Sequence, residues 1–335
     1  MRAIWLAMCL LVGVVEAGCG GDCGCPEPCM CEVGHGCGCE RNLRICEDPN
    51  CDCVPFFNPY ADRGDYDCGW YVWGDWLPDA PTLFRQFAAD PRQVTYSVGW
   101  RFDDDALAQN TIPVSFGNYW GLYRWHCAWP YGGDMEIGIE GAVWAVFEPL
   151  EESSPLIDAD YYVGVPIVYA FDNWQFRLRG YHISTHLGDE FLLNNPGFDR
   201  RNPSAEYLDF YGSYYFGEQI RIYAGLGYII QQDKSFRWKR FFQGFGMEVR
   251  PYSLGYYDCR QRLLGHPIFA AHIRGTRDHK NHIDQTYILG YEWIKLTGLE
   301  KATRIFLEYH DGYSVDGQFC RTPTTWFSVR LSYGY

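Results

Sequence analysis

The chain has 335 residues and a formal net charge of -14. This acidic balance argues against a nucleic-acid partner. Beyond the N-terminus, no apolar run reaches the roughly 20 residues that a membrane-spanning helix needs. A transmembrane β-barrel is still compatible with this composition, because barrels interleave their apolar residues with polar ones. The chain is rich in aromatic residues and glycine, with 26 Tyr, 21 Phe, 13 Trp and 36 Gly.

Residues 1–17 have the pattern of a secretory signal peptide. An uncharged apolar run from Ala3 to Val15 precedes a small-residue cleavage site that ends at Ala17. A lipid anchor on Cys19 is an alternative, but Glu16 occupies a position where an apolar residue is wanted. We therefore expect the mature protein to leave the cytoplasm.

Residues 18–67 are predicted to form an irregular, cysteine-rich head. Few apolar side chains are present to build a core, and in an exported protein such a segment favours disulfides, within the head or to other molecules. A thiolate metal site helped by His35 is the alternative, although Cys-x-Cys spacing is a poor match to structural zinc sites. We predict no metal and no other cofactor. The candidate disulfide cysteines are Cys19, Cys23, Cys25, Cys29, Cys31, Cys37, Cys39, Cys46, Cys51 and Cys53.

Residues 68–92 are predicted to be a linker between the head and a barrel domain at 93–335. A short helical turn is expected from Thr82 to Ala89, with Thr82 as its cap and Pro91 as its stop.

From Val94 onward, apolar and polar residues alternate with the period of two that is typical of β-strands. The last stretch shows the pattern clearly, because Phe327 and Leu331 lie on one face and Arg330 on the other. The predicted strands are 94–102, 113–125, 134–147, 161–171, 174–179, 207–216, 219–230, 241–249, 267–274, 286–293, 304–310 and 325–335.

An even set of antiparallel strands predicts an all-β fold, a closed antiparallel transmembrane β-barrel of about 12 strands. Short turns at 172–173 and 217–218 are expected in the periplasm, and the longer 187–203 connection outside. The long 250–265 connection falls on the wrong side for this rule. A soluble β-sandwich or jelly roll also alternates. Aromatic ends on the apolar faces and full charges on the polar faces favour the barrel.

The polar faces of the predicted strands carry charges that would point into the lumen. One interpretation is an ion-pair network that fills and stiffens a narrow barrel. The other is a small-solute channel with charges at its constriction. Small barrels tend to be filled by their own side chains, which favours the network. The predicted lumen charges are Arg101, Glu136, Glu140, Arg177, Arg179, Asp209, Arg221, Glu248, Arg274, Glu292, Arg304, Glu308 and Arg330.

One group of residues has the pattern of a catalytic site. His182 and Ser184 lie two apart on the lipid-facing side of a strand, so the imidazole could activate the hydroxyl with Asn194 or an acidic residue as the orienting group. The arrangement resembles that of outer-membrane phospholipase A. Alternatively, the strand has left the bilayer here, and these side chains meet only lipid head groups or a loop.

The chain from about Leu77 to its end also resembles a known family. The resemblance is carried by Leu83-Phe84, by residues 89–92, by residues 174–182 and by the block from His186 to Phe191. These segments resemble the DUF1207 family of bacterial outer-membrane β-barrel proteins, a domain of unknown function. The resemblance implies an outer-membrane barrel without an established activity.

Taken together, the sequence predicts a bacterial outer-membrane protein with a structural or small-solute channel role, anchored or cross-linked through its head. The alternative is a lipid hydrolase of the barrel wall. The expected partners are outer-membrane lipid and other envelope proteins joined through disulfides.

Overall fold

A computed structural model describes residues 72–334 of the chain, except residues 79, 258–262, 280–281 and 295–300. The predicted signal peptide, the cysteine-rich head and all ten candidate disulfide cysteines lie outside the described residues.

The described residues form one antiparallel sheet of fourteen strands. The strands are β1 (Trp73–Trp76), β2 (Tyr96–Phe102), β3 (Asn110–Ala128), β4 (Gly133–Phe147), β5 (Leu156–Phe171), β6 (Trp174–Leu187), β7 (Ala205–Phe216), β8 (Ile220–Gln232), β9 (Phe241–Val249), β10 (Tyr256–Tyr257), β11 (Leu263–Thr276), β12 (Ile283–Ile294), β13 (Ala302–Tyr313) and β14 (Pro323–Gly334). The helical turns are α2 (Asp189–Asn194), η1 (Tyr252–Leu254), η2 (Arg277–His279) and η3 (Gly317–Phe319). None of the described helices is long and apolar enough to cross a membrane.

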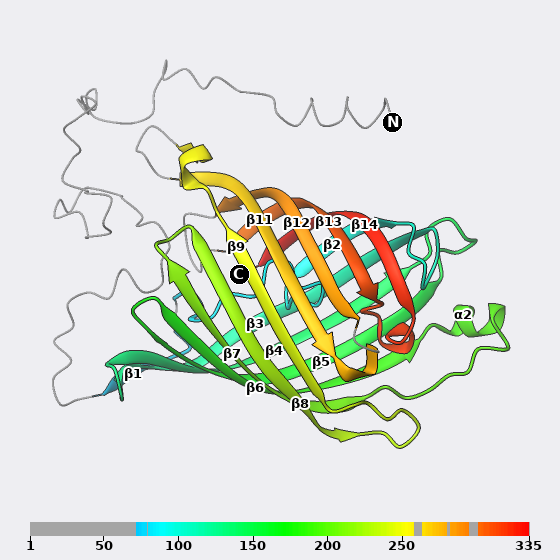
Figure 1. The fold of residues 1–335 in the computed structure, drawn as a ribbon, viewed down its shortest axis with the longest axis horizontal. Coiled ribbons are helices and arrows are strands. Elements are labelled where there is room, and N and C mark those ends of the chain that lie inside the picture. The colour runs from blue at the N-terminus through cyan, green and yellow to red at the C-terminus, as the bar shows by residue number, and fades with distance from the viewer. Residues whose placement is uncertain (1–71, 79, 258–262, 280–281, 295–300, 335) are drawn as a thin grey trace, which may run out of the picture.

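Twelve of these strands close into a barrel, which confirms the predicted fold class. Each strand pairs with its neighbour in chain order, and β14 pairs with β2 to complete the ring. β1 and β10 are additions to the ring, since β1 pairs only with the end of β3 and β10 only with β11. The strands are strongly tilted and wrap around a single interior (Figure 1).

The two ends of the barrel differ. At one end, here called the turn end, two-residue and three-residue turns join β5 to β6 and β7 to β8. Asp172 and Gly217 adopt positive φ angles of 46° and 59° there, as tight hairpin turns require. The connection after β9, with η1 and β10, lies at the same end. The opposite end, here called the loop end, carries the long connection that contains α2 (Figure 1).

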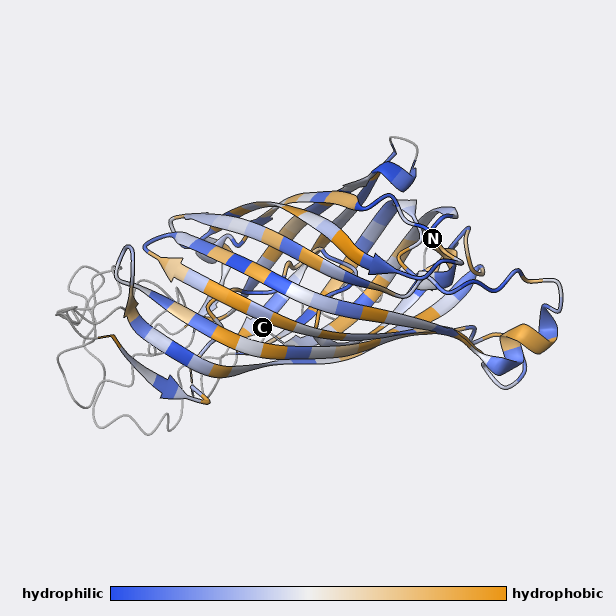
Figure 2. Cartoon of the chain, turned by 90° about the horizontal axis from the view of Figure 1, so that it is seen from below, coloured by the Kyte–Doolittle hydropathy of each residue, from blue (hydrophilic) through white to orange (hydrophobic). Residues whose placement is uncertain are grey.

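The outward face of the barrel is largely apolar. Leu289 in the middle of β12 is 60% exposed, and its partners on the neighbouring strands are Phe269 and Leu307, which are also exposed. Hydrophobic and hydrophilic residues alternate along the strands (Figure 2). Soluble proteins do not carry apolar surface on this scale in contact with water, so the outward face is suited to lipid.

The interior is occupied by the segment before β2, residues 80–95, here called the plug. Leu83, Phe84 and Phe87 are almost completely buried against β5, β7 and β8. Ala88 and Ala89 pack on β11, β12 and β13 on the other side of the lumen. Contact with both sides of the ring places the plug inside the barrel.

The predicted helical turn from Thr82 to Ala89 is wrong, because the plug consists of turns, bends and residues without regular secondary structure. The physical reason is that side chains of the barrel and of the plug itself satisfy its backbone. The Ala88 N–H donates to Glu248 Oε1 at 2.8 Å, and the Gln93 amide donates to the Ala88 carbonyl. Here these bonds replace those that a helix would form.

The outward position of Leu289 can be tested by Leu289→Arg. An arginine at mid-height in the lipid-facing wall should lower the free energy of unfolding by about 2–4 kcal/mol, measured by urea unfolding of the protein in lipid vesicles. The matched control is Leu193→Arg in α2, where the side chain is exposed beyond the strands and the effect should be small. Equal stability of Leu289→Arg and wild type would contradict the lipid contact.

Candidate functional site

The thirteen charged residues predicted for the lumen occupy inward positions of the barrel wall. All of them except Arg179 and Arg274 are buried, and these two line an internal cavity. Most of the buried groups are joined in ion pairs, as charges removed from water require.

The largest ion-pair network lies beside the plug, near the turn end. Glu292 is paired with Arg304 and, at 3.3 Å, with Arg250. Arg250 also reaches Glu248 at 2.7 Å, and Arg221 lies 3.6 Å from the same carboxylate. Arg250 is not among the predicted lumen charges, because it follows the end of β9, where alternation no longer assigns a face. The network holds Glu248, which in turn accepts the plug N–H of Ala88.

Two arginines of the wall clasp the aromatic residues of the plug. The Arg177 guanidinium lies 4.6 Å from the ring centroid of Phe84 and 5.1 Å from that of Phe87. Arg221 lies 4.8 Å and 5.3 Å from the same two rings. Phe87 also stacks on Tyr223, with centroids 3.8 Å apart. These cation–π and stacking contacts offset part of the cost of burying two cations.

The other end of the plug is tied to the loop between β13 and β14. Arg92 forms an ion pair with Asp160, donates to the Val315 carbonyl and lies 3.5 Å from Asp316. Arg101 reaches Asp316 at 2.9 Å. Burial alone would raise the pKa of Asp316, but the charges of Arg101 and Arg92 and its hydrogen bonds lower that pKa below the ordinary value. Asp316 is therefore an anion that joins plug, wall and loop.

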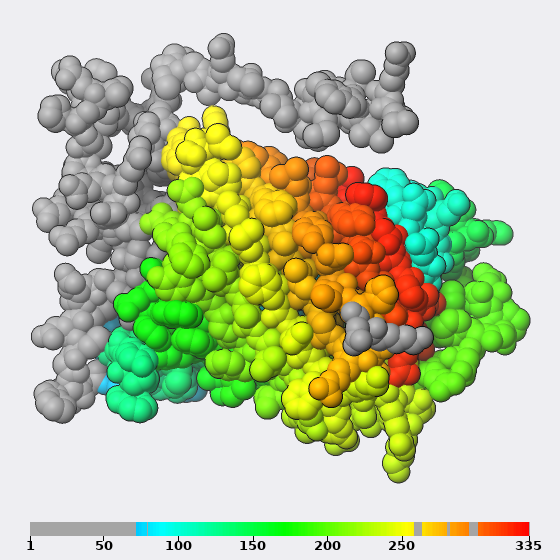
Figure 3. Space-filling model, viewed as in Figure 1, coloured from blue at the N-terminus to red at the C-terminus, as the bar shows by residue number. Residues whose placement is uncertain are grey.

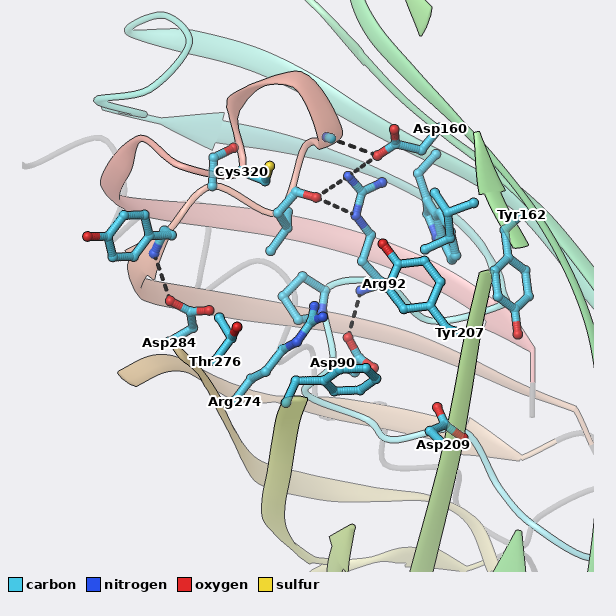
Figure 4. Close-up of a pocket in the computed structure, with 18 of the residues that line it drawn as sticks. Asp90, Arg92, Asp160, Tyr162, Tyr207, Asp209, Arg274, Thr276, Asp284 and Cys320 are labelled. Carbon is cyan, nitrogen blue, oxygen red and sulfur yellow. Dashed lines mark hydrogen bonds and ion pairs between the residues drawn. The ribbon is translucent and has the colours of Figure 1, made fainter. Parts of the chain in front are cut away.

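A cavity of about 160 Å³ remains above the plug, toward the loop end, and is here called the chamber. Phe87, Asp90 and Arg92 of the plug form part of its lining, together with residues of the wall and of the outer loops. Asp160, Tyr207, Asp209 and Arg274 project around it (Figure 4). The residues of the chamber had no sequence signal as a group, because they come from many strands. Only Arg179, Asp209 and Arg274 among them were predicted lumen charges.

The candidate catalytic residues lie on the outside of the barrel. Ser184 Oγ lies 3.1 Å from His186 Nε2, whereas His182 Nδ1 lies 3.2 Å from Glu206 Oε1. Asn194 is exposed on α2, and in the described part of the chain no hydrogen bond joins it to either histidine. The structure thus brings Ser184 to His186, with no hydrogen bond between Ser184 and His182.

No group of three or more His, Cys, Asp or Glu residues arranged to hold a metal ion occurs within residues 72–334 as described.

A closed ring of twelve antiparallel strands, apolar outside and charged inside, is the architecture of an outer-membrane-type β-barrel. The outer-membrane phospholipase dimer of Salmonella typhi with bound calcium has this fold, with a TM-score of 0.50 and 11% identity, and the match covers 71% of this chain and 90% of that chain. The outer-membrane phospholipase A of Escherichia coli gives a TM-score of 0.49 at 11% identity, over 71% and 92% of the two chains. The transport unit of the Escherichia coli autotransporter AIDA-I gives 0.38 at 15% identity, over 76% and 94%. At 11% identity, the similarity to the Salmonella typhi protein concerns the fold alone.

Residues 72–335 match the family described as "Protein of unknown function (DUF1207)". The chain therefore belongs to this family, as the resemblance in its sequence indicated. No curated protein sequence matches the chain.

The contribution of the plug to stability can be tested by Phe87→Ala. This change removes a ring that is stacked on Tyr223 and clasped by two arginines, so the free energy of unfolding should fall by about 3–5 kcal/mol. Urea unfolding of the refolded barrel measures it. Phe245→Ala, at a half-exposed outward position of β9, is the matched control and should cost much less. Equal losses in the two variants would contradict a packed plug.

Proposed function

We propose that the protein is a structural outer-membrane barrel whose lumen is kept closed by its own N-terminal plug. The outward face fits lipid, which is the first partner that we propose. The predicted signal peptide would export the chain, and the cysteine-rich head would anchor or cross-link it to other envelope proteins through disulfides. The plug follows soon after β1, which pairs with the end of β3 at the turn end.

The observation that supports a closed lumen is the position of the plug inside the barrel. The plug contacts opposite walls of the lumen through its apolar residues. It is also fixed at two heights, by Glu248 near the turn end and by Asp160 and Asp316 near the loop end. A solute path through the barrel would require the plug to move, so a structural role is favoured over that of a permanently open small-solute channel.

Closure is testable by single-channel recording in a planar bilayer. We expect no steady conductance from the wild-type protein. A variant in which residues 82–93 are replaced by a Gly/Ser sequence of equal length should show steady steps, because it loses Phe84, Phe87 and Arg92 while the chain stays continuous. Comparison under oxidising and reducing conditions would show whether the head affects the closure.

The control is a variant with an equally long Gly/Ser replacement in the 189–200 loop, which is largely exposed. This variant should show no steady conductance. Steady conductance of the wild-type protein, equal to that of the plug variant, would contradict the closed barrel and support a channel.

A second candidate function, hydrolysis of lipid, is favoured by the contact of 3.1 Å between Ser184 Oγ and His186 Nε2 on the outer wall. A histidine at this distance could take the proton of a nucleophilic hydroxyl. No described carboxylate is hydrogen-bonded to His186, so the pair lacks the orienting group of a complete triad. This candidate is therefore weaker than the structural role.

If the barrel is a hydrolase, Ser184→Ala should abolish fatty-acid release from phospholipid vesicles by the purified protein. His186→Gln should do the same, whereas His182→Gln should have a small effect, because His182 contacts Glu206 instead. Unchanged lipid release by Ser184→Ala would eliminate the hydrolase.

A further inference from the structure

We propose that the chamber binds a small organic monocarboxylate, with Arg274 as the group that holds its charge. This ligand site is separate from the closure of the barrel, because it lies between the plug and the loop end. A ligand would enter from the loop end and would not need to cross the plug.

Arg274 is the least satisfied cation of the chamber. It occupies an inward position of β11, and its guanidinium lies 5.1 Å from the ring centroid of Phe242. Among the described residues it has no ion pair. Its side chain is exposed although it points into the barrel (Figure 4), so solvent reaches it. A free guanidinium has the planar geometry that binds a carboxylate through two parallel hydrogen bonds.

None of the described carboxylates around the chamber forms an ion pair with Arg274, and each of them has another partner. Asp90 accepts the backbone N–H of Arg92 at 2.9 Å and is the one without an ion pair within the described lining. Its negative charge opposes a second negative charge in the same cavity, so a monoanion fits better than a phosphate or a dicarboxylate. The other partners are Arg92 for Asp160, Arg179 for Asp209, and His279 for Asp284.

Aromatic side chains supply the surface for the body of such a ligand. Tyr181 and Tyr207 are stacked with centroids 4.8 Å apart and an interplanar angle of 4°. Neither hydroxyl has a hydrogen-bond partner in the described part of the chain, and both residues line the chamber. The two rings cover each other, and Arg179 lies 4.6 Å from the Tyr181 ring centroid. What the tyrosines can offer a ligand is therefore a ring edge with a donor hydroxyl, which suits an anion with a planar body.

The size of the chamber limits the ligand. Its volume of about 160 Å³ is close to that of an engineered cavity of about 150 Å³ that holds benzene in another protein. A single-ring carboxylate such as benzoate is therefore a suitable probe, and benzamide is its neutral counterpart of nearly equal shape.

The test is isothermal titration of the refolded full-length protein in detergent with benzoate and with benzamide. Wild type should bind benzoate about tenfold or more tightly than benzamide, as expected for a charge-assisted contact. Arg274→Gln should abolish this preference. Arg201→Gln, which alters an exposed arginine paired with Asp199 in the loop, is the matched control and should keep it.

Tyr207→Phe provides a second variant that removes one hydroxyl and retains the ring that stacks on Tyr181. It should weaken benzoate binding by about twofold to tenfold, and it tests the site even if Arg274→Gln does not fold. The proposal is overturned if wild type does not bind benzoate, if benzamide binds equally well, or if folded Arg274→Gln retains the preference. Ligand binding and conductance are measured independently, so failure of the ligand proposal would not contradict the closed barrel.

Discussion

A charge buried inside the barrel must find a partner in the protein, because neither lipid nor bulk water can solvate it there. This constraint organises the interior. Arg250 joins Glu248 to Glu292 near the turn end, and Asp316 is shared between two arginines near the loop end. The plug takes part in both groups of charges, because the Ala88 N–H donates to Glu248 and Arg92 contacts Asp316. Removal of the plug would therefore leave buried charges as well as an empty space.

The fold could be predicted from the sequence because its strongest signal is local. Alternation assigns each residue to a face without knowledge of its partners, and the polar faces then give the lumen. The predicted strand bounds are least accurate where the alternation of apolar and polar residues is weak. At 113–125 the alternation does not assign clear inward and outward faces, and the observed β3 extends further, from Asn110 to Ala128. The strand at 174–179 is part of a longer β6 that ends at Leu187.

The plug could not be predicted, because its position inside the barrel depends on contacts with residues that are distant in the sequence. Leu83, Phe84 and Phe87 between two prolines have the local pattern of a short helix in a linker. What places them inside the barrel is the pair of Arg177 and Arg221, about 90 to 140 positions later in the chain. For a similar reason, the spacing around Ser184 did not decide which histidine it contacts. His182 and His186 are both two residues away, and Glu206 on the next strand determines where His182 points.

The position of the plug in the chain has a consequence for biogenesis. The plug lies between β1 and β2, and both of these strands are hydrogen-bonded into the wall. It is thus a tethered segment with no free end inside the lumen. The ring is completed only when β14, which follows the other ring strands in chain order, pairs with β2. If the plug docks before β14 pairs with β2, the strands of the wall can close around a plug that is already in place. The seam between β14 and β2 would then be the last contact made in the insertion of this protein.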